Sequence, residues 1–169
     1  MKIAASVVGM GKVEEICRVS REDRLGSGIC AQVVVEGGIG MEIPEIRRLF
    51  ENEFGPISEK FDFHCLSLTD VTTASVASRF PGVYVFWKGG DVWKVGRHLA
   101  TPHKRALEHV RDNTTDKTGR FSMGDLAGDP EVRVLIFSAR SESNLHWVAA
   151  LEIFFEASLG PLIRSRRVC

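Results

Sequence analysis

The sequence predicts an α/β fold of the α+β type, in which helices flank a three-stranded antiparallel sheet. Between residues 82 and 158, the apolar pattern gives two short β-prone runs, a helix, a third β-prone run and a second helix. The first two runs are separated by a short glycine-containing turn, which is typical of a hairpin and therefore of antiparallel pairing. The 169 residues can hold one ordinary domain with an appendage.

Residues 1–78 are predicted to form a mixed α/β N-terminal segment. Within it, Pro44 suits the first helical position, an apolar stripe follows, and Gly55-Pro56 ends the helix. A junction rich in serine and threonine, residues 69–78, precedes a second domain at residues 79–169. The elements expected in the N-terminal segment are strands at Lys2–Val8, Ala31–Glu36 and Phe61–Leu66 and a helix at Pro44–Phe54.

The second domain is predicted to follow the order strand, strand, helix, strand, helix. A capping threonine and a first-turn proline, Thr101-Pro102, begin the first helix, and Gly160-Pro161 ends the second. A polar stretch, residues 113–129, is expected to be a long loop. The expected elements are strands at Gly82–Trp87, Val92–Gly96 and Val132–Ser138, and helices at residues 101–112 and at Asn144–Ser158.

The register of the predicted hairpin decides which side chains share a face of the sheet. A loop of three residues, 88–90, places Tyr84 opposite Lys94 on one face and collects apolar pairs on the other face. A loop of two residues would pair Tyr84 with Val95 and mix the two sets. The pattern therefore favours the three-residue loop.

Two features of the predicted helices point to chemistry. Arg105 and His109 are four residues apart, so they project from one helix face. Glu152 stands within the apolar run at residues 147–155. A carboxylate in such a run is costly to bury unless it is paired with a cation or binds a metal.

The charge distribution allows a phosphate-binding face in the second domain. The formal net charge is zero, but residues 1–80 carry 9 basic and 12 acidic residues, against 13 and 10 in residues 81–169. The spacing of Cys17, Cys30, Cys65 and Cys169 suits neither a zinc site nor a disulfide framework. With no apolar run long enough to cross a bilayer, these features predict a cytoplasmic protein with reduced thiols and no membrane partner.

Several short motifs occur in an order and spacing that resemble the GIY-YIG nuclease family over residues 80–166. Gly82-Val83-Tyr84 matches the first motif, Lys94-Val95-Gly96 stands at the second, and Arg97 follows it. Arg105 to His109 is similar to the family's R-x-x-x-H helix, and Leu151-Glu152 matches the later glutamate helix. Lys94 replaces the second tyrosine, as in some restriction-type members, and Arg164 stands where an asparagine is usual.

The resemblance implies a metal-dependent endonuclease that hydrolyses phosphodiester bonds in DNA, of restriction, repair or mobile-element type. The sequence itself does not separate DNA from RNA. Glu152 would hold Mg²⁺ or Mn²⁺, and Arg105 would grip the phosphate. Tyr84 would position or deprotonate water, which requires a nearby cation such as Lys94 to lower the phenol pKa. The implied catalytic residues are Tyr84, Lys94, Arg105, His109 and Glu152, and the implied nucleic-acid-binding residues are Arg97, His98, Lys104 and Arg164.

Two other functions stay open at this point. Lys94 and Arg164 are also compatible with a catalytically impaired module that binds nucleic acid and leaves it intact. A regulatory or assembly protein without affinity for nucleic acid is the third possibility. The N-terminal segment would clamp DNA, pair with another protomer or extend the sheet, and a double-strand cutter with one site per chain would commonly be a homodimer.

Overall fold

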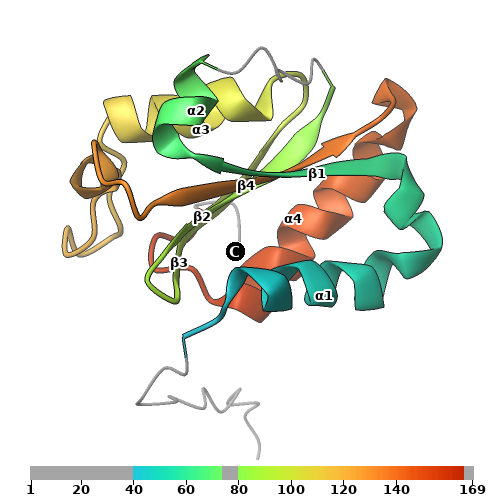
Figure 1. The fold of residues 1–169 in the computed structure, drawn as a ribbon, viewed down its shortest axis with the longest axis horizontal. Helices are drawn as coiled ribbons and strands as arrows, with labels where there is room; N and C mark the ends of the chain where they lie inside the picture. The colour runs from blue at the N-terminus through green and yellow to red at the C-terminus, as the bar shows by residue number, and fades with distance from the viewer. Residues whose placement is uncertain (1–39, 74–79, 166–169) are drawn as a thin grey trace, which may run out of the picture. The chain divides into compact units, whose positions relative to one another are not determined.

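The computed structural model describes residues 40–73 and 80–165 (Figure 1). From Pro44 onward, every helix and strand predicted from the sequence is confirmed, with small differences at its ends. The strands predicted at Lys2–Val8 and Ala31–Glu36 lie outside the described residues. The elements are the helices α1 (Ile43–Phe54), α2 (Leu68–Thr73), α3 (Pro102–Arg111) and α4 (Leu145–Leu159), and the strands β1 (Phe61–Ser67), β2 (Gly82–Lys88), β3 (Asp91–His98) and β4 (Arg133–Ala139).

The described strands form an antiparallel sheet in the order β1-β4-β2-β3. The sheet therefore has four strands, where the sequence predicted three in residues 79–169 and left open that the N-terminal segment extends the sheet. The additional strand, β1, pairs with β4 from Phe61 opposite Ala139 to Ser67 opposite Arg133. The boundary predicted after residue 78 thus falls between strands of one sheet, and the predicted junction begins with helix α2.

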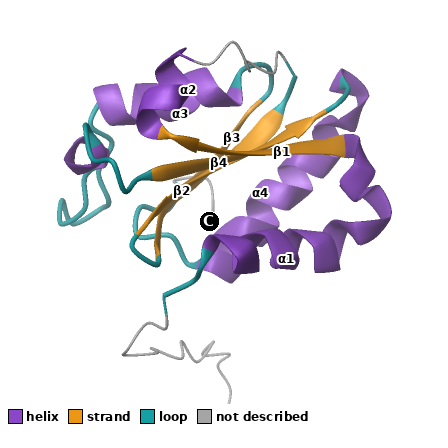
Figure 2. Cartoon of the chain, in the orientation of Figure 1, coloured by secondary structure: helices purple, strands orange, loops and turns teal. Residues whose placement is uncertain are grey.

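Helices cover both faces of this sheet, α1 and α4 on one face and α2 and α3 on the other (Figure 2). Under α1 and α4, the ring of Phe137 lies 5.0 Å from those of Phe50 and Phe155. Under α3, Tyr84 and Phe86 of β2 pack in a second buried cluster, which also contains Ala106 of α3, Met123, Ile136 and Ile163. The alternation along β2 therefore sends Val83 and Val85 to the α4 face and Tyr84 and Phe86 to the α3 face.

The hairpin between β2 and β3 differs from the predicted register. Tyr84 lies opposite Gly96, and Lys94 lies opposite Phe86. The loop has two residues, Gly89 and Gly90, both with positive φ, and a bulge lies between Phe86 and Trp87. Because the extra residue of a bulge shifts the register by one, Tyr84 and Lys94 remain on the same face although they are not opposite each other.

The start of α3 and the end of α4 are fixed in different ways. At α3, the predicted cap by the Thr101 side chain is absent. Instead, Nδ1 of His98 accepts hydrogen bonds from the backbone N–H groups of Thr101, at 2.8 Å, and of Ala100, at 3.2 Å. Helix α4 ends at Gly160 with φ of 55°, as expected for a glycine at this position.

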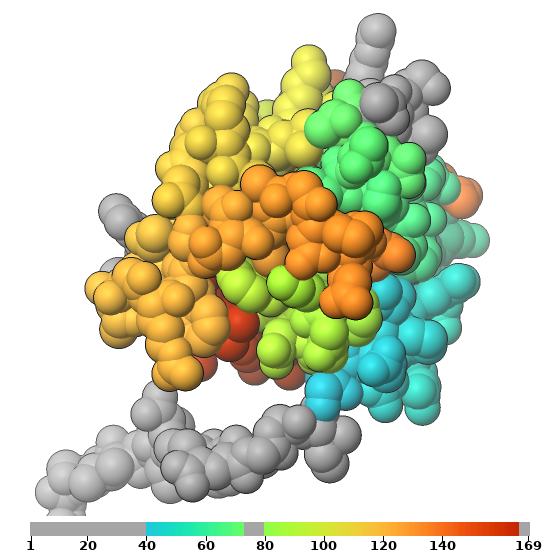
Figure 3. Space-filling model, turned by 60° about the vertical axis from the view of Figure 1, so that its left-hand side comes forward, coloured from blue at the N-terminus to red at the C-terminus, as the bar shows by residue number. Residues whose placement is uncertain are grey.

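The segment after α4 returns to the outer edge of β3. Backbone N–H groups of Leu162 and Ile163 donate to the carbonyls of Val92, at 3.0 Å, and Trp93, at 2.8 Å. Figure 3 shows this segment, in red, recessed between the loop after α3 and the β2–β3 hairpin. It brings Arg164 beside the sheet, close to the residues that the sequence singled out.

Candidate active site

A pocket of about 480 Å³ gathers most of the predicted site residues. Its lining comes from β2, β3, α3 and α4, from the loop after α3 and from the segment after α4. All five predicted catalytic residues are in this lining, with two of the four residues predicted to bind nucleic acid. The polar and charged residues that line it are Tyr84, Lys94, Arg97, Arg105, His109, Asp112, Asn113, Thr114, Thr115, Glu152, Arg164 and Ser165.

The pocket wraps around strand β3, so its two sides come from opposite faces of the sheet. Tyr84 and Lys94 lie on the face covered by α3. Arg97 is opposite Val83, whose side chain packs on the face covered by α4. The segment after α4 covers the edge of β3 only up to Lys94, where Ile163 forms a parallel bridge. Val95, Gly96 and Arg97, the residues that follow, line the pocket.

Tyr84 lies across the backbone of Gly96, its partner on β3. A Cβ atom at residue 96 would come within 2.3 Å of the phenolic oxygen, so a glycine is required for this close approach. The tyrosine is 2% exposed, and its ring makes an edge contact with Phe86 at 6.1 Å between centroids. The glycine of the second motif therefore makes room for the tyrosine of the first motif.

Glu152 forms an ion pair with Arg97, with 3.0 Å between Oε2 and Nη1. The glutamate is 6% exposed, and only about a quarter of the arginine side chain is accessible. The sequence indicated that a carboxylate in this apolar helix needs a partner, and Arg97 is such a partner. Arg97 was expected to contact a flanking phosphate, whereas here its guanidinium lies on the carboxylate.

Arg105 and His109 project from the same face of α3, as predicted, and both line the pocket. Nη1 of Arg105 is 2.7 Å from Oε2 of Glu108 in the next turn of its own helix. This hydrogen bond with the carboxylate raises the pKa of Arg105 above its usual value. More than a third of the Arg105 side chain is exposed, so this pair can open to admit a phosphate at little cost.

His109 is held as a neutral imidazole. Burial, followed by the positive charges of Lys94 and Arg105, lowers its pKa to about 4. Its Nδ1 lies 2.9 Å from the hydroxyl oxygen of Thr114, and its ring centroid is 5.8 Å from that of Tyr84. A neutral ring at this place can orient a hydroxyl or accept a proton, but it brings no positive charge at neutral pH.

The remaining predicted nucleic-acid-binding residues have separate positions. Arg164 lines the pocket and is exposed. Lys104 is exposed on α3 but is not part of this lining. His98, also expected to contact nucleic acid, uses its Nδ1 as an acceptor at the start of α3.

Glu156 is a buried carboxylate that the sequence interpretation missed. It lies one helical turn after Glu152, and its Oε1 accepts a hydrogen bond from the backbone N–H of Ser165 at 3.1 Å. Burial raises its pKa, with the neighbouring Glu152 charge acting in the same direction. The spacing of four between two glutamates of an apolar helix was the signal available in the sequence.

The charges of the pocket suit an anionic ligand. Four cations, Lys94, Arg97, Arg105 and Arg164, and two carboxylates, Asp112 and Glu152, are among its described lining residues. A surplus of positive charge in a concave site attracts phosphate groups.

A hard divalent cation also fits this lining through Glu152. Nowhere among residues 40–73 and 80–165 do three His, Cys, Asp or Glu side chains come together as a potential metal site. Mg²⁺ commonly takes only one or two protein carboxylates and completes its coordination with water and substrate phosphate. The buried carboxylate of Glu152 in a polar pocket provides one such ligand.

Compared with models of protein families, with curated proteins and with solved structures, the chain matches none of them. Within the part of the chain that the structure describes, none of the helices has the length and apolar character needed to cross a membrane.

Proposed function

We propose that this chain is a metal-dependent endonuclease of the GIY-YIG type that hydrolyses phosphodiester bonds, with DNA as the substrate. One observation carries this function: residues from two strands and two helices, selected by their order in the sequence, line one polar pocket. Tyr84, Lys94, Arg105, His109 and Glu152 are separated by up to 68 positions in the chain. A purely structural role for each of them gives no reason for this convergence.

The cations of the pocket bind and orient the phosphate. Arg105 leaves Glu108 and donates its planar pair of N–H groups to two phosphate oxygens. Arg164, an exposed residue of the lining, contacts the same or the neighbouring phosphate. Because the pocket has more cations than carboxylates, the developing negative charge of the transition state is stabilised.

Tyr84 is the residue that orients the attacking water. Its ring is fixed by the contact with Gly96, so the phenolic oxygen has a defined place in the pocket. Lys94 is on the same sheet face and stabilises negative charge that develops on that oxygen. His109, neutral at physiological pH, accepts or relays the proton.

Glu152 holds the divalent cation, Mg²⁺ or Mn²⁺. When bound, such a cation neutralises charge on the phosphate and helps the leaving oxygen to depart. Arg97 orients this carboxylate when no cation is bound, and would turn to a water or a phosphate oxygen when the cation takes its place on Oε2.

Nicking of supercoiled plasmid in the presence and absence of Mg²⁺ tests this function. We expect the wild-type chain to nick DNA only with the cation, and Glu152→Gln and Arg105→Ala to lower the rate by at least about 100-fold, which corresponds to roughly 3 kcal/mol of transition-state stabilisation. Arg111→Ala is a matched control, because Arg111 is an exposed arginine of the same helix outside the pocket. Intact plasmid under all conditions would contradict the proposal.

The pairing of Glu152 with Arg97 favours a second candidate function, a catalytically impaired module that binds nucleic acid. In such a module the guanidinium would keep the cation from the carboxylate. A complex with DNA that weakens steeply with salt, without any cleavage in Mg²⁺ or Mn²⁺, would identify this function. If neither a complex nor cleavage is observed, a regulatory or assembly protein is the favoured function.

A further inference from the structure

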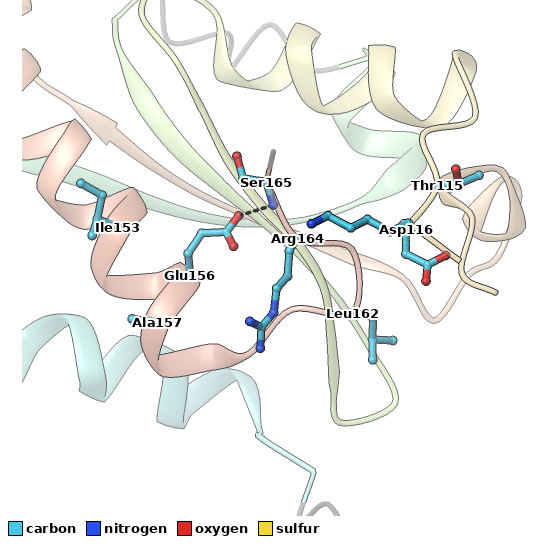
Figure 4. A pocket seen from close by; sticks show the side chains of 9 residues that line it. Thr115, Asp116, Ile153, Glu156, Ala157, Leu162, Arg164 and Ser165 are labelled. Carbon is cyan, nitrogen blue, oxygen red and sulfur yellow. Dashed lines mark hydrogen bonds between the residues drawn. The ribbon is translucent and has the colours of Figure 1, made fainter. Parts of the chain in front are cut away.

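A second pocket, of about 500 Å³, adjoins the candidate active site. The two pockets share three lining residues, Thr115, Arg164 and Ser165, so they are adjacent parts of one groove. Figure 4 shows Glu156 and Arg164 in the middle of the second pocket, between Ile153 and Ala157 of α4 and the loop after α3. A ligand bound to the catalytic residues can therefore extend into this space.

The second pocket has a different chemical character from the first. Three aliphatic side chains, Ile153, Ala157 and Leu162, line it, and Ile153 is 63% exposed. An exposed isoleucine beside a cavity is a contact surface for an apolar or aromatic group.

The charges of this lining are balanced. The described lining contains two cations, Lys117 and Arg164, and two carboxylates, Asp116 and Glu156. The carboxylate of Asp116 accepts hydrogen bonds within its own loop, one of them from the backbone N–H of Phe121 at 3.1 Å. Unlike the candidate active site, the second pocket has no surplus of positive charge, so it suits a neutral group better than a phosphate.

Glu156 gives this pocket a buried hydrogen-bond acceptor. It is 9% exposed, and Oε1 accepts the backbone N–H of Ser165, which fixes the carboxyl group and the segment that carries Arg164. Carboxyl oxygens accept hydrogen bonds from the amino and imino groups of nucleobases. Apolar walls and a hydrogen-bonding group for the edge of the base are among the features of pockets that receive an unstacked base.

We propose that the second pocket receives the base of a nucleotide next to the scissile phosphate, unstacked from its neighbours. This inference rests on the proposed nuclease function and specifies its substrate class. Arg164, common to both pockets, contacts the phosphate that links the two subsites. Because unstacking is least costly for unpaired nucleotides, the preferred substrates are DNA strands with an unpaired nucleotide at the cut, such as flaps or loops, over a continuous duplex.

Fluorescence of 2-aminopurine tests this inference, because its emission rises when the base leaves the stack. The probe stands on either side of the cleaved position, in a flap and in a continuous duplex, and binding is measured with full-length protein in Ca²⁺. Ala157→Trp fills the second pocket with an indole, and Ser158→Trp is the matched control, because Ser158 is an exposed neighbour outside the lining. Thermal unfolding of both variants verifies that they fold.

We expect the emission at one flanking position to rise several-fold on binding to wild type and to Ser158→Trp, and to stay at its free value with Ala157→Trp. We also expect the Ala157→Trp variant to lose at least about 10-fold in kcat/KM on flaps, which is about 1.4 kcal/mol. Equal cleavage of flap and duplex, with unchanged emission and no effect of Ala157→Trp, would overturn the inference and leave the nuclease function intact. A rise in emission that Ala157→Trp removes, without any cleavage, would support the base pocket and refute the nuclease function.

Discussion

The neutral state of His109 makes the stability of the fold depend on pH. Burial is the largest cause of its pKa of about 4, and Lys94 and Arg105 lower it further, while the carboxylates of Glu108 and Asp112 act in the opposite direction. An unfolded chain would titrate this histidine near 6.5. His109 therefore binds a proton less tightly in the folded state than in the unfolded chain, so lowering the pH below 6.5 favours unfolding.

The loss can be estimated from these two pKa values. Stability from this group is complete above pH 6.5, falls as the pH decreases, and stops falling below pH 4, where both states are protonated. At pH 4.5 the linkage relation gives a loss of about 2–3 kcal/mol relative to pH 7, an upper range because the side chain is partly accessible. This is a large fraction of the stability of an ordinary domain.

Urea denaturation at pH 7 and pH 4.5 measures this effect as a difference between variants. Wild type should lose about 2–3 kcal/mol more than His109→Asn between the two pH values, because the other titrating groups are common to both chains. His146→Asn is the matched control, since His146 is exposed at the start of α4, and it should behave as wild type. Equal pH dependence of wild type and His109→Asn would refute the reasoning.

Three further predictions concern single contacts. Gly96→Ala should destabilise the fold by about 1–3 kcal/mol in thermal unfolding and should lower the rate of cleavage, because the added Cβ would displace the phenol of Tyr84. An unchanged melting temperature would show that the Tyr84 ring moves freely. Ser138→Ala should keep or raise stability by about 1 kcal/mol in denaturant titrations, because the buried Ser138 hydroxyl has no hydrogen-bond partner among the described residues. Arg97→Ala should destabilise the fold by about 3 kcal/mol or more, because it leaves the Glu152 carboxylate buried without this cation. Added Mg²⁺ should restore part of the lost stability in the same titration.

Periodicity was sufficient to predict α1, α3, α4 and the four strands, because each has a strong local pattern. Helix α2 was missed, since it lies in the stretch rich in serine and threonine that was predicted to be a junction. Pro44 near the start of α1 and Gly160 after α4 are where their backbone preferences require them. Pairing between distant strands was harder to predict. Strand β1 joins β4 across some 70 residues, and nothing local to Phe61–Ser67 indicates which strand it will pair with.

The candidate site was predicted where side chains follow helical spacing, and missed where contacts depend on tertiary structure. Arg105 and His109 share a face because they are four residues apart. The sequence indicated that Glu152 needs a partner but could not identify it, since Arg97 of β3 meets Glu152 only because α4 packs on that face of the sheet. The cap of α3 was expected from Thr101, while in the structure the ring of His98 accepts the backbone N–H group at that helix start.

The bulge between Phe86 and Trp87 limits how the hairpin can change its length. Removing one residue on either side of the turn without a compensating change would turn the side chains of that strand to the opposite face, so that Lys94 and Tyr84 no longer share a face of the sheet. Removing two residues would preserve the alternation. Insertions and deletions in this hairpin should therefore be tolerated in pairs, and a single one should abolish function even where the protein still folds.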